Sequence, residues 1–273
     1  MASSPYTLTR ECAAEFLGTA ILIFFGLGAV HNAVLTGSYS SVFQVGLMWG
    51  IGVMVAAYAV GEISGAHLNP AVTIALAVSR GFPSRKVLPY ALAQTVGASF
   101  SAGVLYLIFS GTISAHELKE GILRGAAKSV VTASMYGEYF PNPTVGIHGF
   151  AESGYANLSW VAAAAAEFAG TAVLLICILA VTDAKNSGAP LASLGPLFVG
   201  LTVAAVIGVI GPLTQACLNP ARDFGPRFVA YLAGWGGVAF PGPRGLGSTL
   251  AVYLAAPIAG GVLGARLYAA LRR

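Results

Sequence analysis

Two copies of the triplet Asn-Pro-Ala are the residues of this chain with the clearest capacity for binding chemistry. They stand 150 positions apart, as Asn69-Pro70-Ala71 and Asn219-Pro220-Ala221. Asparagine is a favoured N-cap and proline suits the first helical position, so each triplet predicts the start of a helix. The asparagine amide also donates hydrogen bonds without carrying a charge. One copy alone would most simply be a turn, whereas two copies at matched positions favour a shared site for a neutral polar solute.

The composition places these triplets in a membrane. Of the 273 residues, 56% are hydrophobic and 9% are charged, with a mean hydropathy of +0.78; an ordinary soluble domain has about 25% charged residues. A bilayer core requires about 20 mostly apolar residues per helix. Six stretches meet this requirement, roughly 12–30, 42–61, 87–109, 161–182, 188–210 and 248–265. The sequence therefore predicts a membrane protein with six spans.

A second repeated element indicates that the chain is a duplication. The segment Ala14–Ala20 recurs as Ala166–Ala172 with an offset of 152, close to the offset between the triplets. Each half then holds three spans and one triplet, and an odd number of spans makes the second half enter the membrane from the opposite side. Inverted repeats of this kind place a functional site near the bilayer midplane. We predict one transmembrane domain over residues 1–273, with repeat 1 at about 8–109, a loop at about 110–158 and repeat 2 at about 159–273.

The apolar stretch after each asparagine is too short and too closely flanked by full spans to cross the bilayer. Each therefore predicts a re-entrant half-helix, which is tolerated where it lines a watery path or is buried in protein. Two half-helices entering from opposite faces bring the positive ends of their dipoles to one central point. A cation is repelled there, whereas a neutral hydroxyl compound only exchanges one hydrogen-bond partner for another.

The two loops resemble a known family. Segments 64–73 and 218–227 read Ser-Gly-Ala-His-Leu-Asn-Pro-Ala-Val-Thr and Leu-Asn-Pro-Ala-Arg-Asp-Phe-Gly-Pro-Arg. They are similar to the signature loops of the aquaporin family, and the likeness covers nearly the whole chain and is closest to bacterial glycerol facilitators. It implies an all-α membrane protein of six transmembrane helices and two re-entrant half-helices, an inverted repeat of two three-helix halves. It also implies a pore in each subunit, a homotetramer, no cofactor and no metal.

The resemblance further implies which residues line the narrowest point. By matching to glycerol facilitators these are Trp49, Ile207, Ala216 and Arg222. Arg222 would donate to a hydroxyl and repel cations, and Trp49 would face the carbons of a polyol. Water-selective members place a histidine at the position of Ile207. Glycerol facilitators usually have an aromatic residue where this chain has Ala216, and the set of four is more similar to plant nodulin-like intrinsic proteins.

Supporting roles are expected for five further residues. Asp223 and Arg227 are spaced to form an i,i+4 ion pair that braces the second half-helix. Glu15 and Glu167 are repeat mates inside spans, where a carboxylate requires partners, and we expect them to accept hydrogen bonds from the re-entrant loops. His67 belongs to the first loop and is expected to face the inner vestibule. Pro226 should interrupt a helix, yet the family carries the same break and continues.

The basic residues predict the orientation. Placing both termini in the cytoplasm puts eight of the fourteen basic residues inside: Arg10, Arg80, Arg85, Lys86, Lys185, Arg266, Arg272 and Arg273. The positive-inside rule favours this arrangement in a cell membrane. We also expect His31, His116 and His148 to lie in loops and to face solvent.

The function implied is a passive channel for glycerol and other small neutral solutes together with water, with the lipid bilayer as its environment. A water-selective channel and a secondary transporter of a small polar solute are the alternatives, since inverted repeats also serve alternating access. No nucleophile with a base is evident, so we do not expect an enzyme. No basic cluster is dense enough for nucleic acid, and Cys12, Cys177 and Cys217 lie too far apart for a metal site.

Overall fold

The computed structural model describes residues 5–144 and 158–272, and within these ranges it contains helices and no strands. Six helical segments are long and apolar enough to cross a membrane. The full spans include α1 (Leu8–Thr36), α2 (Val42–Ser64), α4 (Val87–Lys119), α7 (Trp160–Thr182) and α8 (Gly195–Thr214). The sixth combines α10 (Gly245–Leu250), a π-helical turn at Ala251–Ala255 and α11 (Ala256–Leu271). The predicted six-span architecture is confirmed.

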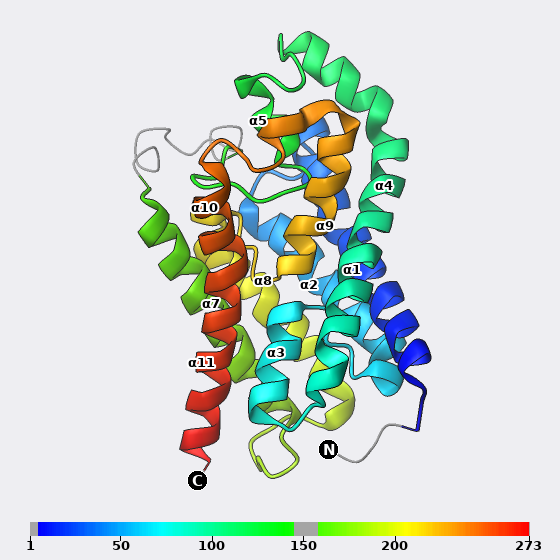
Figure 1. Cartoon of the computed structure of the whole chain (residues 1–273), viewed down its shortest axis with the longest axis vertical. Helices are drawn as coiled ribbons and strands as arrows, with labels where there is room; N and C mark the ends of the chain where they lie inside the picture. Colours follow the sequence, from blue (N-terminus) through cyan, green and yellow to red (C-terminus); the bar gives the residue numbers. More distant parts are fainter. Residues whose placement is uncertain (1–4, 145–157, 273) are drawn as a thin grey trace.

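Two short helices occupy the positions predicted for the re-entrant segments. They are α3 (Pro70–Ser79) and α9 (Pro220–Ala230), and Figure 1 shows α9 above α3 between the long helices α11 and α4. α9 continues through Pro226, as the family pattern implies, and passes into a π-helical turn at Tyr231–Trp235.

The helices pair in the pattern expected of two inverted halves. α1 packs against α4, α7 packs against α11, and α2 packs against α8 between the halves. A Cβ added to Gly97 would overlap the Phe16 carbonyl oxygen, and one added to Gly260 would overlap that of Phe168. Because close backbone approach needs small residues at helix interfaces, both halves use a glycine at the same crossing.

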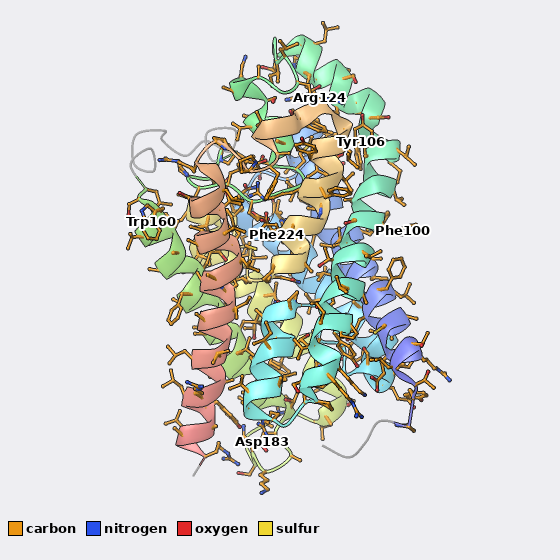
Figure 2. The ribbon with its side chains drawn as sticks, in the orientation of Figure 1. Phe100, Tyr106, Arg124, Trp160, Asp183 and Phe224 are labelled. Atoms are coloured by element: carbon orange, nitrogen blue, oxygen red, sulfur yellow. The ribbon has the colours of Figure 1, made fainter. Side chains whose placement is uncertain are left out.

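Large apolar side chains cover the outside of the bundle. Phe100 on α4 is 58% exposed and Trp160 on α7 is 53% exposed, and both lie on outer faces in Figure 2. In a bilayer such side chains contact lipid. Both ends of the chain lie at the same end of the bundle in Figure 1, as an even number of spans requires.

Two features differ from the sequence prediction. α4 runs ten residues past the predicted end of the third span, to Lys119, and carries the chain beyond the other helices on that side (Figure 1). His31 is not in a solvent-facing loop: it lies within α1, fully buried, with Nδ1 2.8 Å from the Leu27 carbonyl oxygen. Its ring packs edge-on against Tyr136 of the loop between α4 and α7, so it belongs to the interior. This loop is called the outer loop below, and the sides of the bundle are named inner and outer by the orientation that the basic residues predict. His116 lies in the last turn of α4, and His148 lies outside the described residues.

The candidate pore and its constriction

Both half-helices begin at the asparagine of their triplet. Asn69 and Asn219 have extended backbone angles and act as N-caps, each followed by proline at the first helical position. The Asn69 side-chain oxygen accepts from the Ala71 N–H at 2.8 Å, and that of Asn219 accepts from the Ala221 N–H at 3.0 Å. The asparagine oxygens are therefore used within their own half-helices, and only the amide N–H groups face elsewhere.

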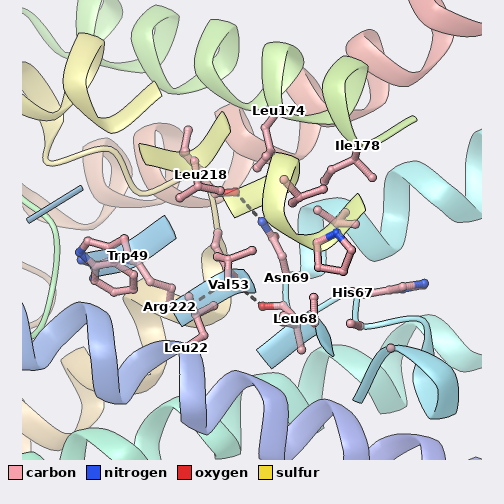
Figure 3. A pocket seen from close by; sticks show the side chains of 18 of the residues that line it. Leu22, Trp49, Val53, His67, Leu68, Asn69, Leu174, Ile178, Leu218 and Arg222 are labelled. Carbon is pink, nitrogen blue, oxygen red and sulfur yellow. Dashed lines mark hydrogen bonds between the residues drawn. The ribbon is translucent and has the colours of Figure 1, made fainter. Parts of the chain in front are cut away.

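The two triplets are joined by reciprocal hydrogen bonds. The Asn69 amide donates to the Leu218 carbonyl at 2.8 Å, and the Asn219 amide donates to the Leu68 carbonyl at 2.7 Å (Figure 3). Leu68 and Leu218 both have φ of 55°, in the left-handed region that leucine rarely adopts. Each asparagine keeps one amide N–H beyond this bond. The arrangement thus fixes two donors side by side where the half-helices meet.

The loop before α3 is organised by a buried glutamate. Glu15 of α1 is fully buried and accepts four hydrogen bonds: Ser64 Oγ at 2.6 Å, Gln94 Nε2 at 2.7 Å and the main-chain N–H groups of His67 at 2.9 Å and Leu68 at 2.7 Å. A carboxylate that is buried in a membrane protein requires such donors. Glu15 therefore shapes the turn that leads into the first half-helix.

Glu167 of α7 does the same for the second loop. It accepts from Thr214 Oγ1 at 2.5 Å and from the N–H groups of Cys217 and Leu218, both at 2.9 Å. These partners are the repeat mates of Ser64, His67 and Leu68, so the duplication extends to the hydrogen bonds. Both carboxylates thus accept hydrogen bonds from the re-entrant loops, which is the role expected from the sequence.

A cavity of about 220 Å³, the inner cavity, passes both triplets and reaches Trp49, Ile207 and Arg222. His67, Asn69, Asn219 and Arg222 are among the polar residues that line it, and Thr73 Oγ1 lies 3.2 Å from the His67 ring. Apolar side chains line it on both sides of Asn69, Leu22 and Val53 from the first half of the chain and Leu174 and Ile178 from the second (Figure 3). The cavity therefore offers a few hydrogen-bonding groups within a mostly apolar lining.

A second cavity of about 40 Å³ lies on the outer side. Trp49, Ile207 and Arg222 line both cavities, whereas Ala216 lines only the inner one. Three of the four residues that the sequence singled out therefore stand where the two cavities meet. Gln215 lines the outer cavity, and its side chain bonds the outer loop, accepting from the Tyr139 N–H at 2.8 Å. It does not occupy the space that Ala216 leaves on the inner side.

Arg222 lies over the ring of Trp49 at this point. Its Cζ atom is 4.2 Å from the centre of the Trp49 ring, and the side chains are almost completely buried (Figure 3). A guanidinium on an indole face is attracted by the ring quadrupole. Nη1 donates to the Tyr136 carbonyl at 3.3 Å, and Nη2 contacts the Glu138 carboxylate. The guanidinium is therefore held from both the span side and the loop side.

Asp223 and Arg227 form the predicted i,i+4 ion pair, with Nε 2.7 Å from Oδ2. The pair also reaches the outer loop. Asp223 Oδ1 accepts from the Glu138 N–H at 2.7 Å, and Arg227 donates to the carbonyl oxygens of Glu138 and Ala239. Their function is therefore wider than bracing α9: they fix the loop over the constriction.

Glu138 is the functional residue that the sequence prediction missed. It is the sole charged residue between Lys128 and Glu152, a signal that a search for isolated charges in outer loops could have found. It lies in the loop, outside the spans, and is fully buried. Burial raises the pKa of its carboxyl to about 8, although the neighbouring Arg222 guanidinium opposes the rise.

Comparisons with known proteins agree with this geometry. Residues 2–268 match the family model described as major intrinsic protein. A glycerol uptake facilitator of Haemophilus influenzae is 42% identical over 262 residues, which is 96% of this chain and 93% of the relative. The glycerol uptake facilitator of Escherichia coli is 42% identical over 266 residues, covering 97% and 89%.

Two further similar proteins are a facilitator named for propanediol and a solved structure from a protozoan parasite. A propanediol uptake facilitator of Citrobacter freundii is 40% identical over 262 residues, covering 96% of this chain and 91% of the relative. Among solved structures, the aquaglyceroporin from Plasmodium falciparum superposes with a TM-score of 0.79 at 28% identity and covers 96% of each chain. Given the match of the family model over nearly its whole length, the chain belongs to the major intrinsic protein family.

Proposed function

We propose that this chain is a passive channel that conducts glycerol and other small neutral solutes together with water, and that excludes ions and protons. The main support is the constriction, where the apolar indole of Trp49 and the donor groups of Arg222 line the path at the same point. A polyol has carbons on one side and hydroxyls on the other, so both surfaces find a partner. The names of the glycerol and propanediol facilitators support the same class of solute.

Selection by charge rests on the centre of the path. The N-termini of α3 and α9 meet there, so the positive ends of both half-helix dipoles face the solute. A cation or hydronium gains no compensating carboxylate from the described residues that line the inner cavity. A neutral hydroxyl accepts from the remaining amide N–H groups of Asn69 and Asn219 and passes on.

Two alternatives are weaker. A water-selective channel would be favoured by a narrower, more polar constriction, but Ile207 offers an apolar side chain there. A secondary transporter requires a site for a coupling ion, and the carboxylates beside the path are already engaged, Glu15 and Glu167 with the loops and Glu138 with Arg222. Neither alternative has a specific observation in its favour.

The cellular setting is part of the proposal. We place the chain in the cell membrane with both termini in the cytoplasm, on the strength of the basic residues at that end, among them Arg80, Lys185 and Arg272. Under this orientation the loop that carries Glu138 lies outside. We also propose a homotetramer, with one pore in each subunit.

The test is stopped-flow light scattering of liposomes that contain the purified protein, first under a glycerol gradient and then under a sucrose gradient. We expect fast re-swelling by glycerol, lost when Trp49 and Arg222 are replaced together by bulky residues. Fast water shrinkage with glycerol flux no better than empty liposomes would reject the glycerol assignment and leave a water channel. Flux that depends on an ion gradient would instead indicate a transporter.

A further inference from the structure

The donor edge of Arg222 that faces the outer loop is already taken within the chain. A guanidinium presents paired N–H groups that bind a carboxylate strongly and with defined geometry. Here Nη1 donates to the Tyr136 carbonyl and Nη2 contacts the Glu138 carboxylate. Arg222 is 4% exposed and Glu138 is 0% exposed, so the contact is shielded from solvent.

Glu138 has little freedom to leave this position. Its N–H donates to Asp223 and its carbonyl accepts from Arg227, so both main-chain polar groups are bound by α9. The preceding residue is Gly137, and a Cβ there would lie 2.5 Å from Arg227 Cγ. The half-helix that carries Arg222 therefore also fixes the carboxylate that contacts it.

The charges of this cluster cancel when Glu138 is ionised. Arg222 and Arg227 carry the positive charges, and Glu138 and Asp223 carry the negative ones. The first half of the chain has no such set, because Val72 and Thr73 stand at the positions that match Arg222 and Asp223. An arginine at a pore constriction without a partner would attract small anions as well as repel cations. With Glu138 ionised, the constriction offers neutral solutes hydrogen bonds without a net charge.

We propose that Glu138 is a specificity-determining residue of the constriction: its carboxylate occupies the edge of Arg222 that a small carboxylate solute would bind, so that the channel rejects anionic analogues of glycerol. This inference rests on the proposed glycerol function. It assigns the selection against anions to a loop residue, in addition to the half-helix dipoles and Arg222, which select against cations.

The test uses glycerate, which has the shape of glycerol with a carboxylate in place of one hydroxymethyl group. Glycerol permeability is measured in liposomes above pH 8, with and without glycerate, for the wild type, Glu138→Gln and Glu120→Gln. Glu120 is a matched control because it is an exposed glutamate on the same side, 3.8 Å from Lys119. Glu138→Gln preserves the volume of the side chain and removes its charge.

We expect glycerate to leave the wild type and Glu120→Gln unchanged and to lower the glycerol permeability of Glu138→Gln by about threefold or more, since it gains a charge-assisted bond to Arg222. Inhibition of the wild type above pH 8, or no inhibition of a folded Glu138→Gln, would overturn the proposal. If that variant does not fold, the wild type is measured at lower pH instead. Protonation then removes the charge of the same carboxyl, and glycerate should again lower the glycerol permeability. Absence of glycerol flux in the wild type would instead reject the proposed function.

Discussion

Gly50 of α2 and Gly200 of α8 face each other so closely that a Cβ on either would overlap the carbonyl oxygen of the other. The two glycines stand 150 positions apart, the offset of the two Asn-Pro-Ala triplets. They therefore mark the axis that relates the two halves. Trp49 and Ile207 project from the same two helices, so the spacing between the helices also sets the width of the constriction.

Gly50→Ala should separate α2 from α8. Overpacking of this kind costs about 1–3 kcal/mol, because the opposing atom is main chain and has no rotamer to change. We expect a lower midpoint of thermal unfolding in detergent. Gly103→Ala in α4 is the control, since a Cβ there meets no other atom within 4 Å. Equal midpoints for the two variants would contradict the close contact.

Glu15→Gln should disorder the first re-entrant loop. Glu15 now accepts hydrogen bonds from four donors. The NH₂ group of a glutamine would face one or more of these donors and leave them without an acceptor, which should lower the free energy of unfolding by at least about 2 kcal/mol. We expect lower thermal stability together with reduced glycerol permeability. Glu62→Gln, at an exposed glutamate bonded only weakly to Tyr6 at 3.4 Å, should change neither quantity. A stable, fully conducting Glu15→Gln would show that the loop is shaped by something else.

Asp223→Asn should destabilise the outer end of the pore. The substitution leaves Arg227, which is 1% exposed, without its charged partner. Removal of one member of a buried ion pair costs about 3–5 kcal/mol. Neutralising Glu120 in the exposed Lys119–Glu120 pair should cost about 1 kcal/mol or less. Thermal unfolding of the two variants under identical conditions measures the difference, and similar losses would refute the structural role of the buried pair.

Ile207→His should shift the channel toward water. Histidine adds a donor and occupies more of the point where the two cavities meet. We expect glycerol permeability to fall several-fold while water permeability is retained, measured on the same liposomes by glycerol and sucrose gradients. Ile207→Leu preserves the apolar character and the volume, and it should leave the ratio of the two permeabilities close to that of the wild type. A parallel fall of both in Ile207→His would count against a role in selection.

Sensitivity of the wild type to glycerate should depend on pH. Burial raises the pKa of Glu138 to about 8, so the carboxylate is present above this pH and is lost as the pH falls below it. Arg222 and Arg227 favour the ionised form, whereas Asp223 and Glu167 disfavour it. Glycerate should therefore inhibit glycerol flux increasingly as the pH is lowered through 8, with no such trend in Glu138→Gln. A flat profile in the wild type would contradict the titration.

Much of this architecture could be predicted because it depends on local sequence. Asn69 and Asn219 cap helices through their own neighbours, and Asp223 and Arg227 are paired by helical spacing alone. The position of Glu138 beside Arg222 was not predicted, because its partners are 84 or more positions away in the sequence. No pattern in an irregular loop encodes such a contact. His31 was misplaced because α1 extends past the apolar stretch predicted to end near residue 30, so an expected loop residue is buried within the helix.

The reciprocal bonds between the triplets also bear on how the chain is made. During synthesis the first half enters the membrane while Leu218 and Asn219 do not yet exist. Until they arrive, the Asn69 amide has no acceptor and the Leu68 carbonyl has no donor from the other triplet, and an unsatisfied polar group in hydrocarbon costs several kcal/mol. These two bonds therefore form only after the second half has been inserted. We expect that neither half forms the path alone and that the path is completed late in synthesis.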